Sequence, residues 1–172
     1  MIACPVIDLH AHVHRFSVPV GGFRADDLLR VMEPLGVELA VVSSSEAIVY
    51  DMRRGNAALS VEIARRSQLR GYVFANPNDV PGSLDELRCY LPEPQFIGLK
   101  LYSGSIIGQP LDCPGHREIL SVVADEFPHA IVLFHCGEND PRNYHGLLAV
   151  ARAYPQLTFL AGHMGSSLWR EA

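Results

Sequence analysis

The sequence predicts an α/β protein with a parallel sheet, of the TIM-barrel (β/α)8 type but with only about six βα units. Six short apolar segments rich in Val, Ile, Leu and Phe alternate with helical patterns, as is typical of buried parallel strands and their crossover helices. No Gly-rich phosphate turn follows the first apolar segment, which disfavours the competing doubly wound open sheet. Polar residues gather instead at the carboxyl ends of the apolar segments, where barrels place their chemistry.

The amino-terminal elements follow from local patterns. Residues 5–13 and 39–43 are expected strands. Residues 25–35 form an expected helix because Leu28, Leu29, Met32 and Leu35 share one face, and residues 56–67 form the next, with Leu59 and Ile63 together.

The remaining elements continue the alternation. Strands are expected at residues 71–75, 96–102, 130–135 and 157–161, and helices at residues 83–91, 115–126 and 141–153. The capping box Ser83-Leu84-Asp85-Glu86 is expected to open the first of these helices. Residues 166–172 read as the beginning of one more helix.

Composition limits the classes of function. A chain of 172 residues with 48% hydrophobic and 19% charged residues predicts one folded domain over residues 1–172 and excludes disorder. The net charge of −5 argues against nucleic acid or an anionic membrane as partner. No apolar run is long enough to span a bilayer and no signal peptide is recognisable. Four cysteines without C-x-x-C spacing indicate reduced thiols and a cytoplasmic location.

The first strand carries the first candidate site. Side chains alternate along a strand, so Asp8, His10 and His12 are expected on one face. One histidine alone is more often structural than functional. Two imidazoles at successive positions on the same face of a strand end can reach one cation, and neutral imidazole suits zinc.

Three other strand ends strengthen this interpretation. Lys100 lies opposite Ile97, Leu99 and Leu101 in its strand, His135 ends the fifth strand, and His163 follows the sixth. The sequence places these residues at the carboxyl ends that meet around the mouth of a barrel. Four histidines and a lysine form a pattern that none of them makes alone.

The motifs Ile7-Asp8-Leu9-His10-Ala11-His12, Gly98-Leu99-Lys100-Leu101, Phe134-His135-Cys136-Gly137 and Ala161-Gly162-His163-Met164-Gly165 resemble those of the amidohydrolase superfamily. The chain is most similar to the branch that includes aminocarboxymuconate-semialdehyde decarboxylase and resorcylate decarboxylases. The resemblance runs from the first strand to the end of the chain.

The resemblance implies roles for matched positions. His10, His12 and His135 match metal ligands, and His163 matches a residue that is a catalytic acid or base in mononuclear members and a ligand in binuclear ones. Lys100 stands where binuclear members carry a carboxylated lysine that bridges two ions, although in the decarboxylase-like branch it need not be a ligand. The implied cofactor is a divalent metal, zinc before manganese or iron, as one or two ions.

One family residue has no counterpart in the sequence. The aspartate of the eighth strand, a metal ligand and base in the family, is not matched, and Glu138, Asp140 and Glu171 do not fit its pattern. We therefore expect the 172 residues to be a carboxyl-terminally shortened version of a longer barrel. Its two unpaired edge strands predict poor solubility or a homo-oligomer, and the missing carboxylate predicts little activity.

Weaker candidates complete the set. Arg15 and Tyr102 lie beside matched positions and are candidate binders of a substrate carboxylate. The other histidines, His14, His116, His129 and His145, are expected to be solvated, and Cys136 is expected to be a buried thiol that points away from the barrel mouth.

Three functions remain in competition at this point. The leading one is a metal-dependent enzyme that acts on a small molecule, by hydrolysis of an amide, ester or lactone or by nonoxidative decarboxylation of a carboxylate. The second is a metal-free Schiff-base lyase with Lys100 as nucleophile. The third is an inactive metal-binding fragment of a longer enzyme.

Overall fold

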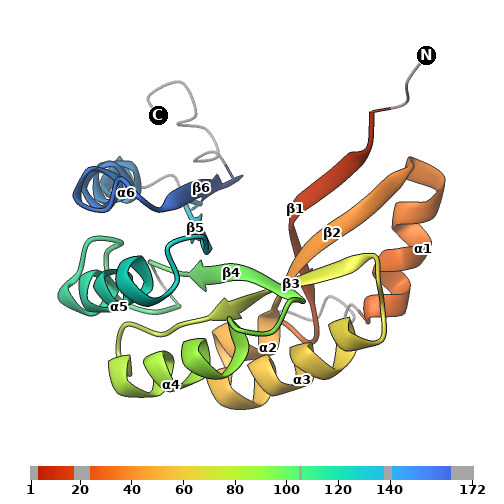
Figure 1. Cartoon of the computed structure of the whole chain (residues 1–172), viewed down its shortest axis with the longest axis horizontal. Helices are drawn as coiled ribbons and strands as arrows, with labels where there is room; N and C mark the ends of the chain where they lie inside the picture. Colours follow the sequence, from red (N-terminus) through yellow and green to blue (C-terminus); the bar gives the residue numbers. More distant parts are fainter. Residues whose placement is uncertain (1–3, 18–23, 105, 138–140, 164–172) are drawn as a thin grey trace.

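The computed structural model describes residues 4–17, 24–104, 106–137 and 141–163, and its centre is a curved parallel sheet of six strands (Figure 1). The strands are β1 (Val6–Val13), β2 (Val37–Ser44), β3 (Leu69–Phe74), β4 (Phe96–Leu101), β5 (Ile131–His135) and β6 (Thr158–Gly162). They are neighbours in sequence order throughout. A doubly wound sheet would reverse this order in its middle, so the prediction of a barrel-type sheet is confirmed.

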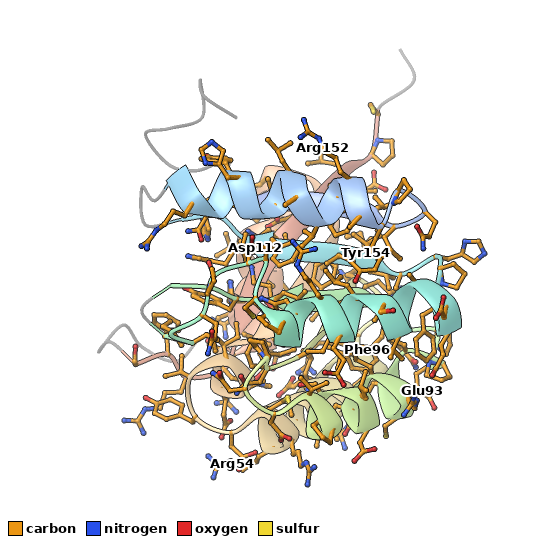
Figure 2. The ribbon with its side chains drawn as sticks, turned by 90° about the vertical axis from the view of Figure 1, so that its left-hand side faces the viewer. Arg54, Glu93, Phe96, Asp112, Arg152 and Tyr154 are labelled. Atoms are coloured by element: carbon orange, nitrogen blue, oxygen red, sulfur yellow. The ribbon has the colours of Figure 1, made fainter. Side chains whose placement is uncertain are left out.

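The helices cover the outer side of the curved sheet. They are α1 (Ala25–Leu35), α2 (Ser45–Val49), α3 (Met52–Ala64), α4 (Val80–Tyr90), α5 (Pro114–Glu126) and α6 (Pro141–Ala153). Figure 2 shows α4, α5 and α6 side by side on this outer surface, where the Tyr154 hydroxyl donates to the Arg117 carbonyl oxygen over 2.7 Å. All predicted strands and the five predicted helices are present, α2 is an addition, and the helix expected at 166–172 lies outside the described residues.

Two apolar layers follow from the alternation of side chains in the strands. Leu99 and Leu101 of β4 belong to the large core between the sheet and the helices. Val41, Tyr72 and Leu133 form a smaller cluster on the inner face of the curve. Polar residues on the inner face at the carboxyl ends of the strands therefore lie next to this apolar cluster.

The sheet forms a half-barrel with two edges. Within the described residues, β1 pairs only with β2, and β6 pairs only with β5. Val6, Ile7 and Leu9 on β1 are 49%, 50% and 42% exposed, which is unusual for a strand of a parallel sheet. Self-association through these edges stays a prediction. Among the helices of the described segments, none combines the length and the apolarity needed to cross a membrane.

The start of α4 differs from the prediction. The helix begins at Val80, because the Asp79 carboxylate accepts the Gly82 amide proton over 3.0 Å and Pro81 suits the first turn. Ser83 is therefore inside the first turn, and its hydroxyl donates to the Asn76 carbonyl oxygen over 2.9 Å. Asp79, four residues before Ser83, fixes this helix end in place of the predicted capping box.

Candidate active site at the carboxyl edge of the sheet

The site histidines reach one another because parallel strands all end at the same edge. His12 pairs with Ser43 of β2, and His135 of β5 pairs with Gly162 of β6. The register of β1 shifts between Asp8 and Ala11, where three steps on β1 match two on β2. This β-bulge, which strict alternation did not predict, sits at His10 and is of a kind common beside active sites.

A local hydrogen bond stabilises the bulge. The Asp8 carboxylate accepts the backbone N–H of His10 over 2.9 Å, so this acid supports the backbone that carries the first histidine. Gly162 makes room for that histidine, because a Cβ atom there would lie 3.0 Å from His10 Cε1 and 2.7 Å from the Phe134 carbonyl oxygen.

Four imidazoles and one amine form the centre of the site. The Nε2 atoms of His10 and His12 are 3.2 Å apart, and Lys100 Nζ lies 3.0 Å from His10 Nε2. The ring of His163 contacts the rings of His10 and His135 edge-on, with centroids 4.7 Å apart in both pairs. Predicted residues from β1, β4, β5 and the turn after β6 therefore lie together.

Burial keeps the imidazoles neutral. It is the largest cause that lowers the pKa of His10 to about 2, of His12 to about 4 and of His135 to about 3, and the nearby Lys100 charge acts in the same direction. Burial and Lys100 also lower the pKa of His163. Neutral imidazoles keep a lone pair free to bind a metal ion at physiological pH.

Lys100 is the most buried charge-bearing side chain of the site, with no exposed surface. Burial lowers its pKa to about 7, against a small opposing effect of the Cys136 thiol. The thiol itself is buried in the outer core, as predicted, and burial raises its pKa to about 11.

Aromatic and polar neighbours hold the tip of β5. Tyr102 stacks on His135 with ring centroids 3.9 Å apart. The Ser103 hydroxyl contacts the His135 carbonyl oxygen over 3.3 Å and the Asn143 side-chain oxygen over 2.9 Å. Asn143 in turn donates to the Gly137 carbonyl oxygen over 3.3 Å. No sequence pattern marked Ser103 or Asn143, because their role depends on α6 packing beside this tip.

The donor set fits a divalent metal in chemistry and in part in geometry. Two nitrogen ligands at the zinc distance of about 2.1 Å in a tetrahedral arrangement are about 3.4 Å apart, close to the 3.2 Å between the two Nε2 atoms. His135 Nδ1 is buried and has no hydrogen-bond partner among the described residues. Within those residues, however, no three His, Cys, Asp or Glu side chains stand as a ready metal cluster. The three-histidine site therefore stays a prediction.

The two candidate substrate binders differ in position. Tyr102 is part of the site, since it covers one face of His135 and joins a small apolar cluster with Ile48 and Phe74. Arg15 is exposed, and its guanidinium lies over the Tyr50 ring at 6.0 Å from the centroid instead of joining the histidines. Glu138, Asp140 and Glu171 lie outside the described residues.

The histidines expected to be solvated behave differently from one another. His129 and His145 are exposed, as predicted. The expectation was wrong for His116, which is fully buried in α5 and whose Nδ1 contacts the Pro110 carbonyl oxygen over 3.2 Å. His14 is half-buried, 2.9 Å from the Ser44 hydroxyl, and has a left-handed backbone with φ of 71°.

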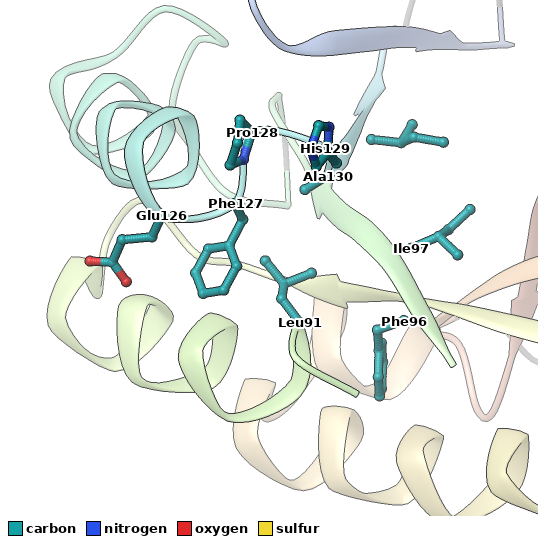
Figure 3. Close-up of a pocket in the computed structure, with 9 residues that line it drawn as sticks. Leu91, Phe96, Ile97, Glu126, Phe127, Pro128, His129 and Ala130 are labelled. Atoms are coloured by element: carbon teal, nitrogen blue, oxygen red, sulfur yellow. The ribbon is translucent and has the colours of Figure 1, made fainter. Parts of the chain in front are cut away.

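A separate apolar cavity of about 540 Å³ opens at the other end of the sheet (Figure 3). Leu91, Phe96, Ile97 and Phe127 line it at the start of β4 and the end of α5. It contains none of the clustered histidines. Because the chemistry of a parallel barrel lies at the carboxyl ends of its strands, this cavity is not the candidate active site.

Comparison with solved structures supports the fold. The chain is similar to 2,6-dihydroxybenzoate decarboxylase from Rhizobium, with a TM-score of 0.71 and 20% identity over 96% of this chain and 69% of that one. It is also similar to 5-carboxyvanillate decarboxylase from Novosphingobium aromaticivorans, complexed with manganese and a nitrobenzoic acid, with a TM-score of 0.74 and 14% identity over 95% and 66%. A structure of amidohydrolase II has a TM-score of 0.73 at 15% identity over 95% and 68%.

These proteins have the fold that the resemblance implied, and the predicted fold is confirmed. The chain spans about two thirds of the length of each of the three. No protein-family model and no curated protein sequence matches the chain. At these identities the similarity establishes the architecture, and activity has to be argued from the site.

Proposed function

We propose that the chain acts as a metal-dependent enzyme of the amidohydrolase type, which hydrolyses or nonoxidatively decarboxylates a small carboxylate. The observation that carries this proposal is the pair of neutral imidazoles, His10 and His12, whose Nε2 atoms face each other at 3.2 Å. When both rings carry their proton on Nδ1, the two Nε2 lone pairs face the same point and can bind one cation there.

His10 and His12 would hold the ion, with His135 as the third ligand. A divalent ion bound there supplies a Lewis acid that polarises a carboxylate or carbonyl group and makes a bound water more acidic. Zinc is our first choice, and manganese is the ion in the 5-carboxyvanillate decarboxylase complex. We keep one or two ions as alternatives.

His163 is assigned to proton transfer. Its side chain is exposed, and its ring contacts the rings of both His10 and His135, so a bound substrate can reach it. In decarboxylation the C–CO₂ bond breaks and its electron pair stays on carbon, where a proton must be delivered. In hydrolysis the same imidazole would accept a proton from the attacking water.

The substrate is expected to be a small carboxylate with a planar apolar part. Phe74, Tyr102 and Ile48 form an apolar cluster beside the histidines, in which Tyr102 stacks on His135. Two of the similar structures bear the names of decarboxylases of aromatic acids, 2,6-dihydroxybenzoate and 5-carboxyvanillate. These two acids are therefore the first substrates to assay.

Metal content tests the proposal. Wild type purified without chelators should contain about one equivalent of divalent metal, and the His10→Ala/His12→Ala variant should contain almost none. The matched control is His129→Ala/His145→Ala, which removes two exposed histidines and should retain the metal. Equal metal content in all three proteins would refute the assignment.

The second candidate is a Schiff-base lyase. The lowered pKa of Lys100, about 7, favours it because the unprotonated amine is the nucleophile. The complete burial of Lys100 against His10 opposes it. Borohydride with a carbonyl substrate would trap a covalent adduct on wild type but not on Lys100→Met if this candidate is correct.

A further inference from the structure

Three consecutive serines at the junction of β2 and α2 lie beside the first-strand histidines, and each has a different environment. Ser43 is fully buried, and its hydroxyl has no hydrogen-bond partner among the described residues. The Ser44 hydroxyl accepts the Ala47 amide proton over 3.1 Å and so caps α2. The Ser45 hydroxyl, 3% exposed, lies 3.5 Å from His12 Nδ1.

The proposed metal site restricts where the protons of His10 and His12 can be. A neutral imidazole has one N–H donor and one lone pair, on different nitrogens. The Nε2 atoms of His10 and His12 face each other at 3.2 Å, and in the proposed site both bind the ion. The single proton of each neutral ring must then be on its Nδ1 atom.

The structure provides an acceptor for this proton on His12. The Ser45 oxygen lies 3.5 Å from His12 Nδ1, within reach of an N–H on that atom. An isolated imidazole favours the opposite tautomer, with the proton on Nε2, so the protein has to impose this one.

We propose that Ser45 is a positioning residue for His12: its hydroxyl accepts the Nδ1–H and leaves the Nε2 lone pair free for a metal ion. The inference rests on the proposed metal site and extends it to a residue outside the ligand set. Histidine ligands of metals usually donate their other ring N–H to such a partner, and loss of that partner commonly weakens metal binding about 10–100-fold.

The chain provides a matched control. Ser43→Ala removes a buried hydroxyl two residues away, from a side chain that makes no hydrogen bond in the described part of the protein. Ser45→Ala leaves the cap of α2 intact, because Ser44 and not Ser45 accepts the Ala47 amide. Both variants are therefore expected to fold, and a urea melt of each verifies this.

Two measurements test the proposal. In the metal-free protein, imidazole ¹⁵N chemical shifts of His12, assigned by their loss in His12→Ala, should show a protonated Nδ1 in wild type and Ser43→Ala. In Ser45→Ala they should move towards the Nε2–H tautomer. Zinc affinity, measured by competition with a chelating dye, should fall about 10–100-fold in Ser45→Ala and stay unchanged in Ser43→Ala.

The outcomes separate the two proposals. If wild type binds no zinc, the proposed function fails, and the His12 tautomer alone decides the role of Ser45. If wild type binds zinc, an unchanged tautomer in Ser45→Ala would overturn the role of Ser45. Equal affinities of Ser45→Ala and Ser43→Ala would overturn it as well.

Discussion

Replacing Asn56 by Ala should be strongly destabilising, because this side chain joins α3 to the end of β3. Asn56 is fully buried. Its amide nitrogen donates to the Phe74 carbonyl oxygen and to the Glu86 carboxylate, and its oxygen accepts the Phe74 amide proton, each over 3.0 Å. Alanine would leave both backbone groups of Phe74 without these partners.

The expected loss follows from these two groups. A buried backbone donor or acceptor left unpaired costs about 1–3 kcal/mol, so the two together predict a loss of about 2–6 kcal/mol in the free energy of unfolding. Phe74 pairs with Lys100 in the sheet, so the change also loosens the strand beside the candidate site.

Urea unfolding at pH 7 measures this loss from the shift of the midpoint at constant slope. The matched control is Asn78→Ala, which removes two side-chain hydrogen bonds, with Ile107 and Gln109, from an exposed position; Asn56→Ala removes three from a buried one. Water can replace the bonds of Asn78, so the control should lose less than about 1.5 kcal/mol. Equal midpoints for the two variants would refute the reasoning.

Two other predictions concern histidines. If the site holds one ion, His163→Asn should keep the metal and lower turnover at least about 100-fold. If His163→Asn instead loses a second metal equivalent, and the intact mass of the wild-type protein shows a carboxylated Lys100, the site holds two ions. His116 is neutral in the folded protein because burial lowers its pKa to about 4, whereas the unfolded chain binds a proton near 6.5. Its contribution to stability is therefore present above pH 6.5 and is lost as the pH falls towards 4. From pH 7 to 4.5 wild type should lose about 2 kcal/mol more than His116→Leu in urea melts, and parallel pH profiles would contradict this.

Strand alternation predicted much of the site from the sequence. The positions of His10, His12, Lys100 and His135 at carboxyl ends of parallel strands follow from apolar segments that end in a polar residue, and the structure brings them together. The pattern works because the sheet edge is set by topology and needs no detail of packing.

Features that depend on packing between distant elements could not be predicted from the sequence. The bulge at His10 depends on the register between β1 and β2. The position of the Arg15 side chain depends on the place of the Tyr50 ring, which follows α2. The burial of His116 depends on the loop that carries Pro110 folding over α5. Each involves a partner that local periodicity does not reveal.

The central claim is that His10 and His12 hold a divalent ion, and anomalous diffraction from crystals grown with zinc tests it most directly. Data collected on both sides of the zinc absorption edge locate the ion without reference to activity. The account predicts one strong anomalous peak about 2.1 Å from the Nε2 atoms of both His10 and His12, with His135 as a further ligand. A map with no peak between these two histidines, in crystals that contain zinc elsewhere, would contradict it.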